Sequence, residues 1–286
     1  MSNPSQGLIP ASVIIHVLNE KLNLPNALAS VCSRFDEVFV VDAGSTDGTQ
    51  EIARSHGAQV VQIEGDRTTL VKQRNWALDK LQTRHDWVYI LDADESVPDD
   101  LCEEIAERVR NPLPDIDGYW VRYKEIILGR PLTRAALYPN WNMRLFKRSV
   151  ARYEDRKVNA HIKIDHVRTS QLQAHFIHDD KRGFASYIRR MASITVIEAL
   201  SLDELFKPNN DLVGASLFSA SFVARRRALK KLFYRLPFRP LIIFLYLYVW
   251  RMGFLEGKAG LYHSLYRACT EVLVNALRYE AEMGNK

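Results

Sequence analysis

The segment Trp87-Val-Tyr-Ile-Leu-Asp-Ala-Asp94 decides how this chain is expected to fold. Its first five residues are apolar, and the run is too short for a helix, so it predicts a buried strand that ends on two carboxylates. Segments of the same character come earlier, at Ser12–Val17, Glu37–Asp42 and Gln59–Ile63. Amphipathic, helix-like stretches lie between them, near Pro25–Cys32, Thr49–Gly57 and Leu70–Leu81. This alternation predicts an α/β fold, in which helices flank a mostly parallel sheet joined by right-handed crossovers.

Polar and acidic residues gather where these strands end. Ligands of open α/β sheets bind beyond the carboxyl ends of the strands, so the strand ends are candidate site positions. The residues found there are Asn19, Glu20, Asp42, Asp92, Asp94 and Glu95. The sequence therefore predicts a polar site along one edge of the sheet.

Asp92 and Asp94 are the most informative of these residues. Alternate residues of an extended chain face the same side, so the two carboxylates are expected to act as a pair. Adjacent carboxylates repel unless a cation or a proton lies between them. Mg²⁺ or Mn²⁺ takes one or two carboxylates and fills its other positions with water and substrate phosphates. The pair predicts a divalent cation that holds a phosphorylated ligand.

Asp42 and Arg74 are further candidates. Asp42 ends a strand before the glycine-containing turn Ala43–Gly48, where it is placed to hydrogen-bond a nucleoside. Arg74 interrupts the apolar stripe of the predicted helix Leu70–Leu81, and a buried guanidinium requires an anionic partner. That partner is either a donor phosphate or a structural aspartate.

Charge divides the chain into two parts. Residues 1–118 hold 10 Lys and Arg against 20 Asp and Glu, and residues 119–286 hold 29 against 14, giving net charges of −10 and +15. Strand-like segments continue to about residue 183, and the chain reads as helical from Phe184 onward. We expect one α/β domain with the ligand site over residues 1–183 and a basic helical region over 184–286.

The helical region contains two uncharged runs, Leu212–Ala224 and Pro240–Trp250, with the basic cluster Arg225–Lys231 between them. A membrane-spanning helix needs about 20 apolar residues, so both runs fall short. The pattern is typical of a helix that lies in the headgroup region of an anionic membrane. The alternatives are two buried helices of the appendage, or a surface for self-association.

Four motifs occur in the order and spacing of family 2 glycosyltransferases. They are Val13-Ile-Ile-His-Val-Leu-Asn-Glu20, Val40-Val-Asp-Ala-Gly-Ser-Thr-Asp-Gly-Thr49, Lys72-Gln-Arg-Asn75 and Leu91-Asp-Ala-Asp-Glu95. Further support comes from Arg144-Leu-Phe146, His178 and Arg251–Leu261. Over Ser12–Leu261 the chain resembles most closely the bacterial branch of lipopolysaccharide-core β-glucosyltransferases.

The resemblance implies a GT-A fold, a nucleoside diphosphate sugar donor, an Mg²⁺ or Mn²⁺ cofactor and inversion at the anomeric carbon. By position, Asn19, Glu20 and Asp42 would border the nucleoside, and Arg74 would reach the nucleotide. Asp92 would contact the ribose or the metal, and Asp94 the metal. His178 is a candidate for the diphosphate or the metal, or else a structural histidine.

One position departs from the family. Relatives carry a glutamate, the natural base for the acceptor hydroxyl, where this chain has Ala160. Three explanations stay open: Asp155, His161 or Asp165 is the base; the protein binds donor without turnover; or the glutamate was replaced in this copy to trap a complex. Intact donor-side motifs favour the third.

We expect an inverting hexosyltransferase that uses UDP-hexose and a lipid-linked or lipopolysaccharide-core acceptor. Three scattered cysteines and the absence of a secretory pattern in Met1–Pro10 predict a cytoplasmic protein, peripheral at the inner face of the membrane. A nucleotidyltransferase is disfavoured because no glycine-rich basic loop follows the first strand. A donor sensor or scaffold is the alternative that Ala160 supports. No nucleic-acid-reading motif is found, so we expect no nucleic-acid partner.

Overall fold

The computed structural model describes residues 7–64, 69–153, 162–163, 168–206, 236 and 238–284. The chain forms two compact units. Unit 1 comprises Met1–Thr133 and Tyr138–Gly183, and unit 2 comprises Arg134–Leu137 and Phe184–Lys286.

The first half of the unit 1 sheet is parallel. Its strands lie in the order β3 (Gln59–Gln62), β2 (Phe35–Asp42), β1 (Ile9–Val17) and β4 (Trp87–Asp92). The four segments predicted as strands are these four strands, and helices join them. Their carboxyl ends therefore meet at one edge, which confirms the α/β class and the direction of the predicted strands.

The second half of the sheet has mixed directions. It continues from β4 with β8 (Asn140–Lys147), β6 (Ile116–Ile127), β11 (Arg168–His178) and β5 (Glu95–Ser96), while β7 (Arg130–Leu132) pairs with β6. Only β6 and β11 run parallel to each other there. Because β5 is antiparallel to β11, the pairing sets His178 opposite Glu95. Strands β9 (Arg152–Tyr153) and β10 (Ile162–Lys163) form a separate pair.

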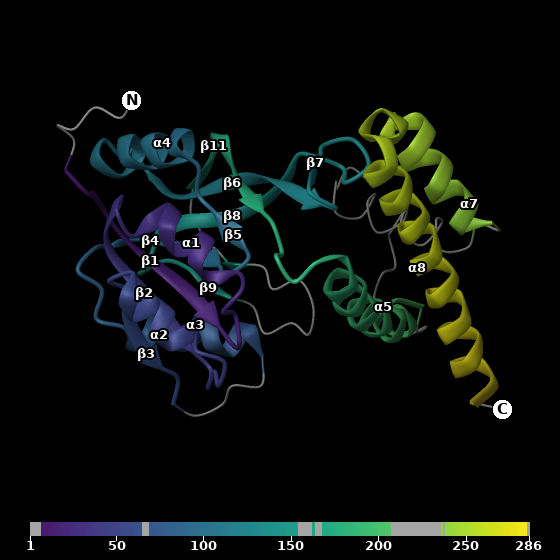
Figure 1. Cartoon of the computed structure of the whole chain (residues 1–286), viewed down its shortest axis with the longest axis horizontal. Helices are drawn as coiled ribbons and strands as arrows, with labels where there is room; N and C mark the ends of the chain where they lie inside the picture. The colour runs from purple at the N-terminus through teal and green to yellow at the C-terminus, as the bar shows by residue number, and fades with distance from the viewer. Residues whose placement is uncertain are drawn as a thin grey trace. The chain divides into compact units, whose positions relative to one another are not determined.

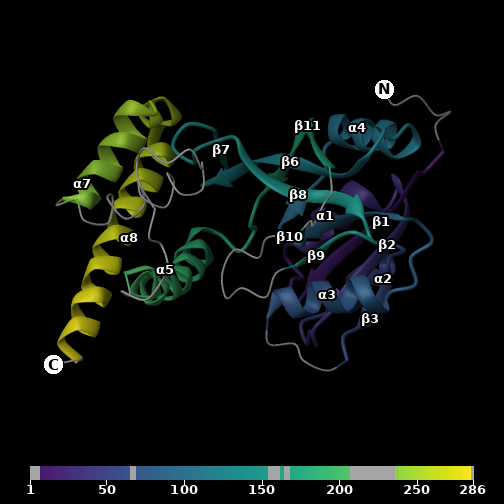
Figure 2. The same cartoon turned by 180° about the vertical axis from the view of Figure 1, so that it is seen from behind.

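Helices cover both faces of the sheet (Figures 1 and 2). Alternate residues of β1 show which helix lies on which face, because successive side chains of a strand point to opposite sides. Val13 and Ile15 belong to one apolar cluster with α1 (Leu24–Val31), α4 (Asp99–Arg110) and Ala53 of α2 (Thr49–Ser55). Ile14 belongs to the other cluster, with α3 (Leu70–Lys80). Helices thus pack against both faces of the parallel strands, and these helices hold the strands whose carboxyl ends form the candidate edge.

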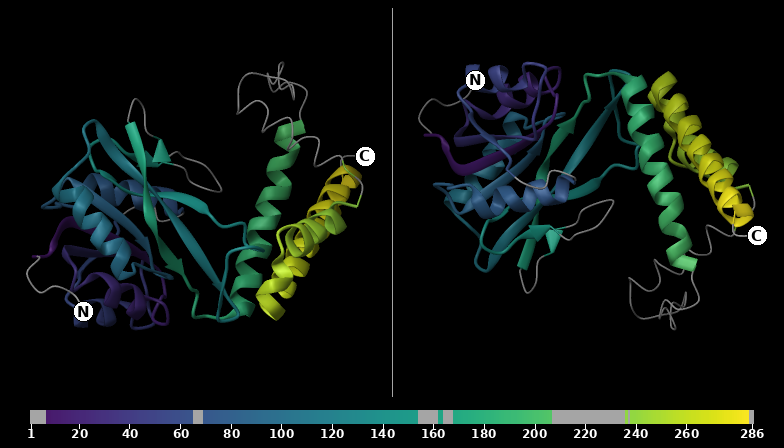
Figure 3. Two further views of the ribbon diagram at one scale, coloured as in Figure 1. Left: turned by 90° about the horizontal axis from the view of Figure 1, so that it is seen from above. Right: turned by 90° about the horizontal axis from the view of Figure 1, so that it is seen from below.

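Unit 2 is helical in its described part. It contains α5 (Phe184–Phe206), α7 (Arg239–Phe244), the π-helix η1 (Leu245–Trp250), the 3₁₀-helix η2 (Gly253–Glu256) and α8 (Gly257–Gly284). Both α5 and α7 pack on α8, as Figure 3 shows. Among the described helices none is long and apolar enough to cross a membrane alone. One bent pair of these helices has the length and composition of a membrane span: Arg239–Trp250 and Gly253–Ala281, with an angle of 71° between them.

Candidate functional site

The loops that follow β1 and β2 bind each other at the carboxyl edge. Asn19 adopts a left-handed backbone conformation (φ 57°), and its side-chain oxygen accepts a hydrogen bond of 2.9 Å from the Thr46 amide. The Asn19 amide in turn donates to the Ser45 hydroxyl at 2.9 Å, and the Glu20 amide donates to the Thr49 hydroxyl at 2.9 Å. The two loops therefore form one ledge, which we name the loop ledge (Asn19–Lys21 with Ser45–Thr49).

Asp42, at the end of β2, stabilises the loop ledge through hydrogen bonds of its side chain. Its side chain is completely buried and accepts from the amides of Gly44 and Ser45 at 3.0 Å and from Gln50 Nε2 at 2.8 Å. The turn requires the positive φ of Gly44 (106°) and Gly48 (95°). The Asp42 carboxylate thus shapes the loop, and its contact with a nucleoside stays a prediction.

Asp92 lies between two buried arginines. It forms ion pairs with Arg74 and, at 2.8 Å, with Arg144. Burial raises the pKa of Asp92, but the charges of Arg144 and Arg74 outweigh it and hold that pKa well below its usual range. Of the two partners considered for Arg74, the structure contains the aspartate, and contact of Arg74 with a donor phosphate stays a prediction.

Glu95 completes this group. It is buried, pairs with Arg144, and accepts a hydrogen bond of 3.0 Å from the Asp92 amide. Burial raises the pKa of Glu95 to about 7, against the opposing pull of Arg144. Arg74, Asp92, Glu95 and Arg144 are named the inner network.

Asp94 has different partners, although one residue separates it from Asp92. The strand β4 ends at Asp92, and Ala93 and Asp94 already lie in a turn. Asp94 Oδ2 lies 3.2 Å from His178 Nε2 and 3.9 Å from Arg182 Nη2. Asp92 and Asp94 thus have different partners in this structure, and the strand expected to align their carboxylates ends at Asp92; their joint binding of a cation stays a prediction.

His178 is half-buried among carboxylates. Burial opposes its positive charge, but the hydrogen bond to Asp94 and the charges of Asp94, Glu95 and Glu125 outweigh burial and raise its pKa to about 9. Its Nδ1 lies 3.9 Å from Glu125 Oε1. His178 is thus held in the charged form at neutral pH when no metal competes for it.

Arg182 joins Asp94 to the loop ledge. It bonds Glu20 at 2.9 Å and Asp180 at 2.8 Å. Burial raises the pKa of Asp180, but the Arg182 hydrogen bonds outweigh it and lower that pKa to about 2. Asn23 fixes this arrangement by donating to Glu20 at 2.8 Å and accepting from the Lys181 amide at 2.7 Å. Glu20, Asp94, His178, Asp180 and Arg182 are named the outer cluster.

A divalent cation fits the outer cluster better than the inner network. Both oxygens of Asp92 are already paired with arginine, so binding a cation there would dismantle two buried ion pairs. Asp94 and His178 are close together and partly exposed, and an imidazole beside a carboxylate suits Mn²⁺. Within the described ranges no three His, Cys, Asp or Glu residues are arranged to hold an ion. Asp94 and His178 are thus two candidate ligands, and Mg²⁺ or Mn²⁺ takes water and phosphate oxygens at its other positions.

Several site residues escaped the sequence reasoning. Arg144 entered the sequence prediction only as part of a motif, although an arginine between the apolar residues Met143 and Leu145 signals a buried anion. Asp180 and Arg182 carried no signal, since they follow β11 far from the motifs along the chain. Ala160, Asp155, His161 and Asp165 lie outside the described residues.

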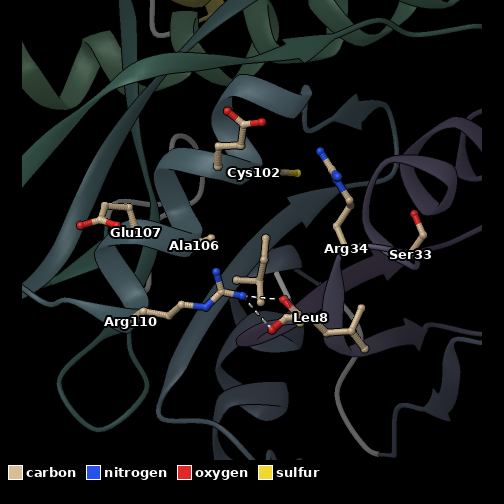
Figure 4. A pocket seen from close by; sticks show the side chains of 10 residues that line it. Leu8, Ser33, Arg34, Cys102, Ala106, Glu107 and Arg110 are labelled. Carbon is tan, nitrogen blue, oxygen red and sulfur yellow. Dashed lines mark hydrogen bonds between the residues drawn. The ribbon is translucent and has the colours of Figure 1, made fainter. Parts of the chain in front are cut away.

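A cavity of about 350 Å³ lies at the other end of β1 (Figure 4). Leu8, Arg34, Cys102 and Arg110 are among its lining residues. Burial raises the pKa of the Cys102 thiol to about 11, so it is not a nucleophile at neutral pH. The cavity is separate from the loop ledge and the outer cluster.

The family model for glycosyl transferase family 2 matches residues 12–190, which is more than half of the chain. The match includes the loop ledge, the inner network and the outer cluster. The chain belongs to glycosyl transferase family 2. The predicted family is thus confirmed.

Similar proteins agree with this assignment. The chain is 26% identical over 280 residues to the lipopolysaccharide core biosynthesis glycosyltransferase LpsC of Rhizobium meliloti, with 94% of each chain covered. An uncharacterized glycosyltransferase of Rickettsia prowazekii is 39% identical over 94 residues, 33% of this chain and 31% of that protein. These matches place the chain near the lipopolysaccharide-core branch.

Solved structures resemble the chain more distantly. TarS 1–349 of S. aureus covers 96% of this chain and 91% of its own, with 15% identity and a TM-score of 0.42. Glucosyl-3-phosphoglycerate synthase of Mycobacterium tuberculosis, in complex with Mn²⁺ and UDP, has 24% identity and a TM-score of 0.33, covering 40% and 43%.

Proposed function

We propose that this glycosyltransferase moves a hexose, with inversion, from UDP-hexose to a lipopolysaccharide-core or lipid-linked saccharide. The observation that carries the proposal is the meeting of the loop ledge and the outer cluster at the carboxyl edge of the parallel strands, inside the family match. Ligands of such sheets bind at this edge. The similarity to LpsC supports a saccharide of the lipopolysaccharide core as acceptor.

The donor diphosphate is proposed to bind between the loop ledge and the outer cluster. Asn19 and Glu20 would border the nucleoside, with Asp42 holding their loop in shape. Asp94 and His178 would hold Mn²⁺ or Mg²⁺, which supplies positive charge to the leaving diphosphate. Arg182, the cation already beside Asp94, would contribute a second positive charge at the same place.

The acceptor hydroxyl is proposed to attack the anomeric carbon opposite the leaving nucleoside diphosphate. That attack requires a base for the hydroxyl proton. By the resemblance to the family, residue 160 would be the position of the base, and Asp155, His161 and Asp165 are the other candidates. The inner network would take no part in proton transfer, since its charges are paired with one another.

Ala160→Glu tests the base. We expect transfer to rise at least about tenfold, because a positioned general base typically contributes a factor of about 100 or more. The measurement is release of UDP in the presence of a lipopolysaccharide-core acceptor, with Ala29→Glu, which adds a glutamate at an exposed alanine of α1, as the control. Unchanged turnover would show that the base lies elsewhere.

Donor binding can be tested without turnover. A thermal-shift series with UDP-, GDP-, ADP- and dTDP-sugars, with and without Mn²⁺, should show stabilisation by one nucleotide only, and less of it in the presence of a chelator. Stabilisation that is equal with and without Mn²⁺ would remove the metal from the proposal.

A second candidate is a protein that binds the nucleotide sugar without transferring it. Ala160 favours it, because alanine cannot accept a proton. The product assay on Ala160→Glu separates the two functions. In either case the protein is proposed to work in the cytoplasm, peripheral at the inner face of the membrane, where a lipid-linked acceptor would be found.

A further inference from the structure

The helix formed by α7 and η1 exposes an apolar face. No charged residue occurs from Pro240 to Trp250. The exposed side chains recur in pairs about four residues apart, and they continue past the end of the helix. They are Phe238, Leu241, Ile242, Leu245, Tyr246, Val249, Trp250, Met252, Phe254 and Leu255, between 38% and 78% exposed. We name this set the apolar ridge; a contiguous patch of this kind marks an interaction surface.

The opposite side of the same helix is anchored inside unit 2. Leu247 is buried, and Arg239 is buried with its guanidinium bound to Asn275 and 3.8 Å from Glu271, both on α8. Figure 1 shows α7 alongside α8. Because its polar anchor faces inward, the helix cannot rotate to hide the apolar ridge without removing Arg239 from its partners.

A tight bend extends the ridge beyond the helix. A Cβ atom on Gly253 would lie 2.7 Å from the Leu247 carbonyl oxygen, and one on Gly260 would clash with the Gly253 carbonyl. Glu256 accepts from the amides of Arg134 at 2.8 Å and Ala135 at 2.9 Å, which fixes the bend. The bend therefore sets Met252, Phe254 and Leu255 in a short, braced segment directly after Trp250.

Charge indicates what this ridge contacts. From Leu212 to Leu255 the sequence has eight Lys and Arg and no Asp or Glu. A second copy of the chain would bring the same positive charge against itself, which disfavours self-association through this segment. An apolar surface with negative charges at its border is what an anionic bilayer offers, and each basic residue near such a surface adds to binding.

Length excludes a simple crossing by this helix. Twelve residues, Arg239–Trp250, rise about 18 Å at most, while the hydrocarbon core of a bilayer is about 30 Å thick. We infer that the apolar ridge lies in the plane of an anionic phospholipid bilayer, at the boundary between headgroups and acyl chains. Trp250 and Tyr246 would lie at headgroup depth, where aromatic rings with a polar group are favoured.

This inference deepens the proposed function, because it names the surface that would bring the transferase to a lipid-linked acceptor. Vesicle binding needs neither donor nor acceptor. Vesicle binding can therefore be absent while donor binding is present, and donor binding can be absent while vesicle binding is present.

The test is flotation of the full chain with vesicles of equimolar phosphatidylethanolamine and phosphatidylglycerol, compared with vesicles of phosphatidylcholine alone. We expect Val249→Glu together with Trp250→Glu to lower partition into the anionic vesicles about tenfold or more, because two charges would have to enter the boundary region. Replacing Arg225, Arg226 and Arg227 by Gln should lower it about tenfold as well, and only for the anionic vesicles. The matched control is Leu113→Glu, which places a charge on an exposed apolar side chain of unit 1.

Circular dichroism of each variant checks that the helices are retained, which is expected for the substitutions at Leu113, Val249 and Trp250 because these side chains are exposed. Absence of flotation by the parent chain would overturn the inference. Equal loss with Leu113→Glu would also overturn it, since the effect would not belong to the ridge. If Val249→Glu with Trp250→Glu instead converts a dimer to a monomer in size-exclusion chromatography and leaves flotation unchanged, the ridge is a contact between copies.

Discussion

The inner network and the outer cluster begin one residue apart, at Asp92 and Asp94, yet they are chemically opposite. The inner network pairs its carboxylates with the buried guanidinium groups of Arg74 and Arg144. The outer cluster sets three carboxylates against Arg182 and His178. A carboxylate whose oxygens are both paired with buried arginines stabilises the edge of the sheet, whereas Asp94, 3.2 Å from His178 and 3.9 Å from Arg182, can exchange its partners for a ligand.

This difference assigns separate roles within one motif. Asp92 holds the ends of α3, β4 and β8 together, because its arginine partners come from α3 and β8. Asp94 faces the segment after β11 that carries Arg182. Stability is therefore expected to depend on the first aspartate and ligand binding on the second.

The largest expected effect comes from a substitution that breaks the inner network. Asp92→Asn should lower the free energy of unfolding by about 3–5 kcal/mol, because it leaves two buried guanidinium groups without a full counter-charge. Urea unfolding followed by circular dichroism measures it. The matched control is Asp115→Asn, which removes an exposed pair with Arg168 at 3.1 Å and should cost about 1 kcal/mol or less. Equal losses in the two variants would contradict the distinction between the regions.

The next effect concerns ligand binding. Asp94→Asn should lower transfer by the Ala160→Glu protein about 100-fold or more, corresponding to about 3 kcal/mol, while leaving unfolding nearly unchanged. The measurement is the rate of UDP release at saturating Mn²⁺. Asp179→Asn is the control, since Asp179 lies close by but pairs with Lys181. If Asp94→Asn destabilised the fold as much as Asp92→Asn, the outer cluster would be structural too.

The smallest effect is a pH dependence of the outer cluster. The pKa of His178 is raised from 6.5 to about 9 in the folded protein. Its contribution to stability is therefore complete below pH 6.5 and is lost as the pH rises through 9, amounting to about 2–3 kcal/mol. Thermal unfolding from pH 6 to 10 without metal should show this decline. The decline should be absent in His178→Gln; an unchanged profile in that variant would assign the titration to another group.

The sequence predicted the candidate edge well, because local patterns determine it. Short apolar runs with intervening amphipathic segments specify a parallel α/β sheet, and such a sheet brings Asn19, Asp42 and Asp92 to one edge whatever the remaining contacts are. The need of Arg74 for an anion also followed from its place in an apolar stripe.

Only the tertiary structure showed which charged side chains form ion pairs with each other. Arg144 reaches Asp92 from the neighbouring strand β8. Arg182 reaches Glu20 although 162 residues separate them in the sequence. Such pairings depend on strand order and on where a strand ends, neither of which a local pattern contains. The same reason applies to Pro240–Trp250: an uncharged run predicts burial or membrane contact equally well, and the inward anchor of Arg239 shows that its apolar side faces outward.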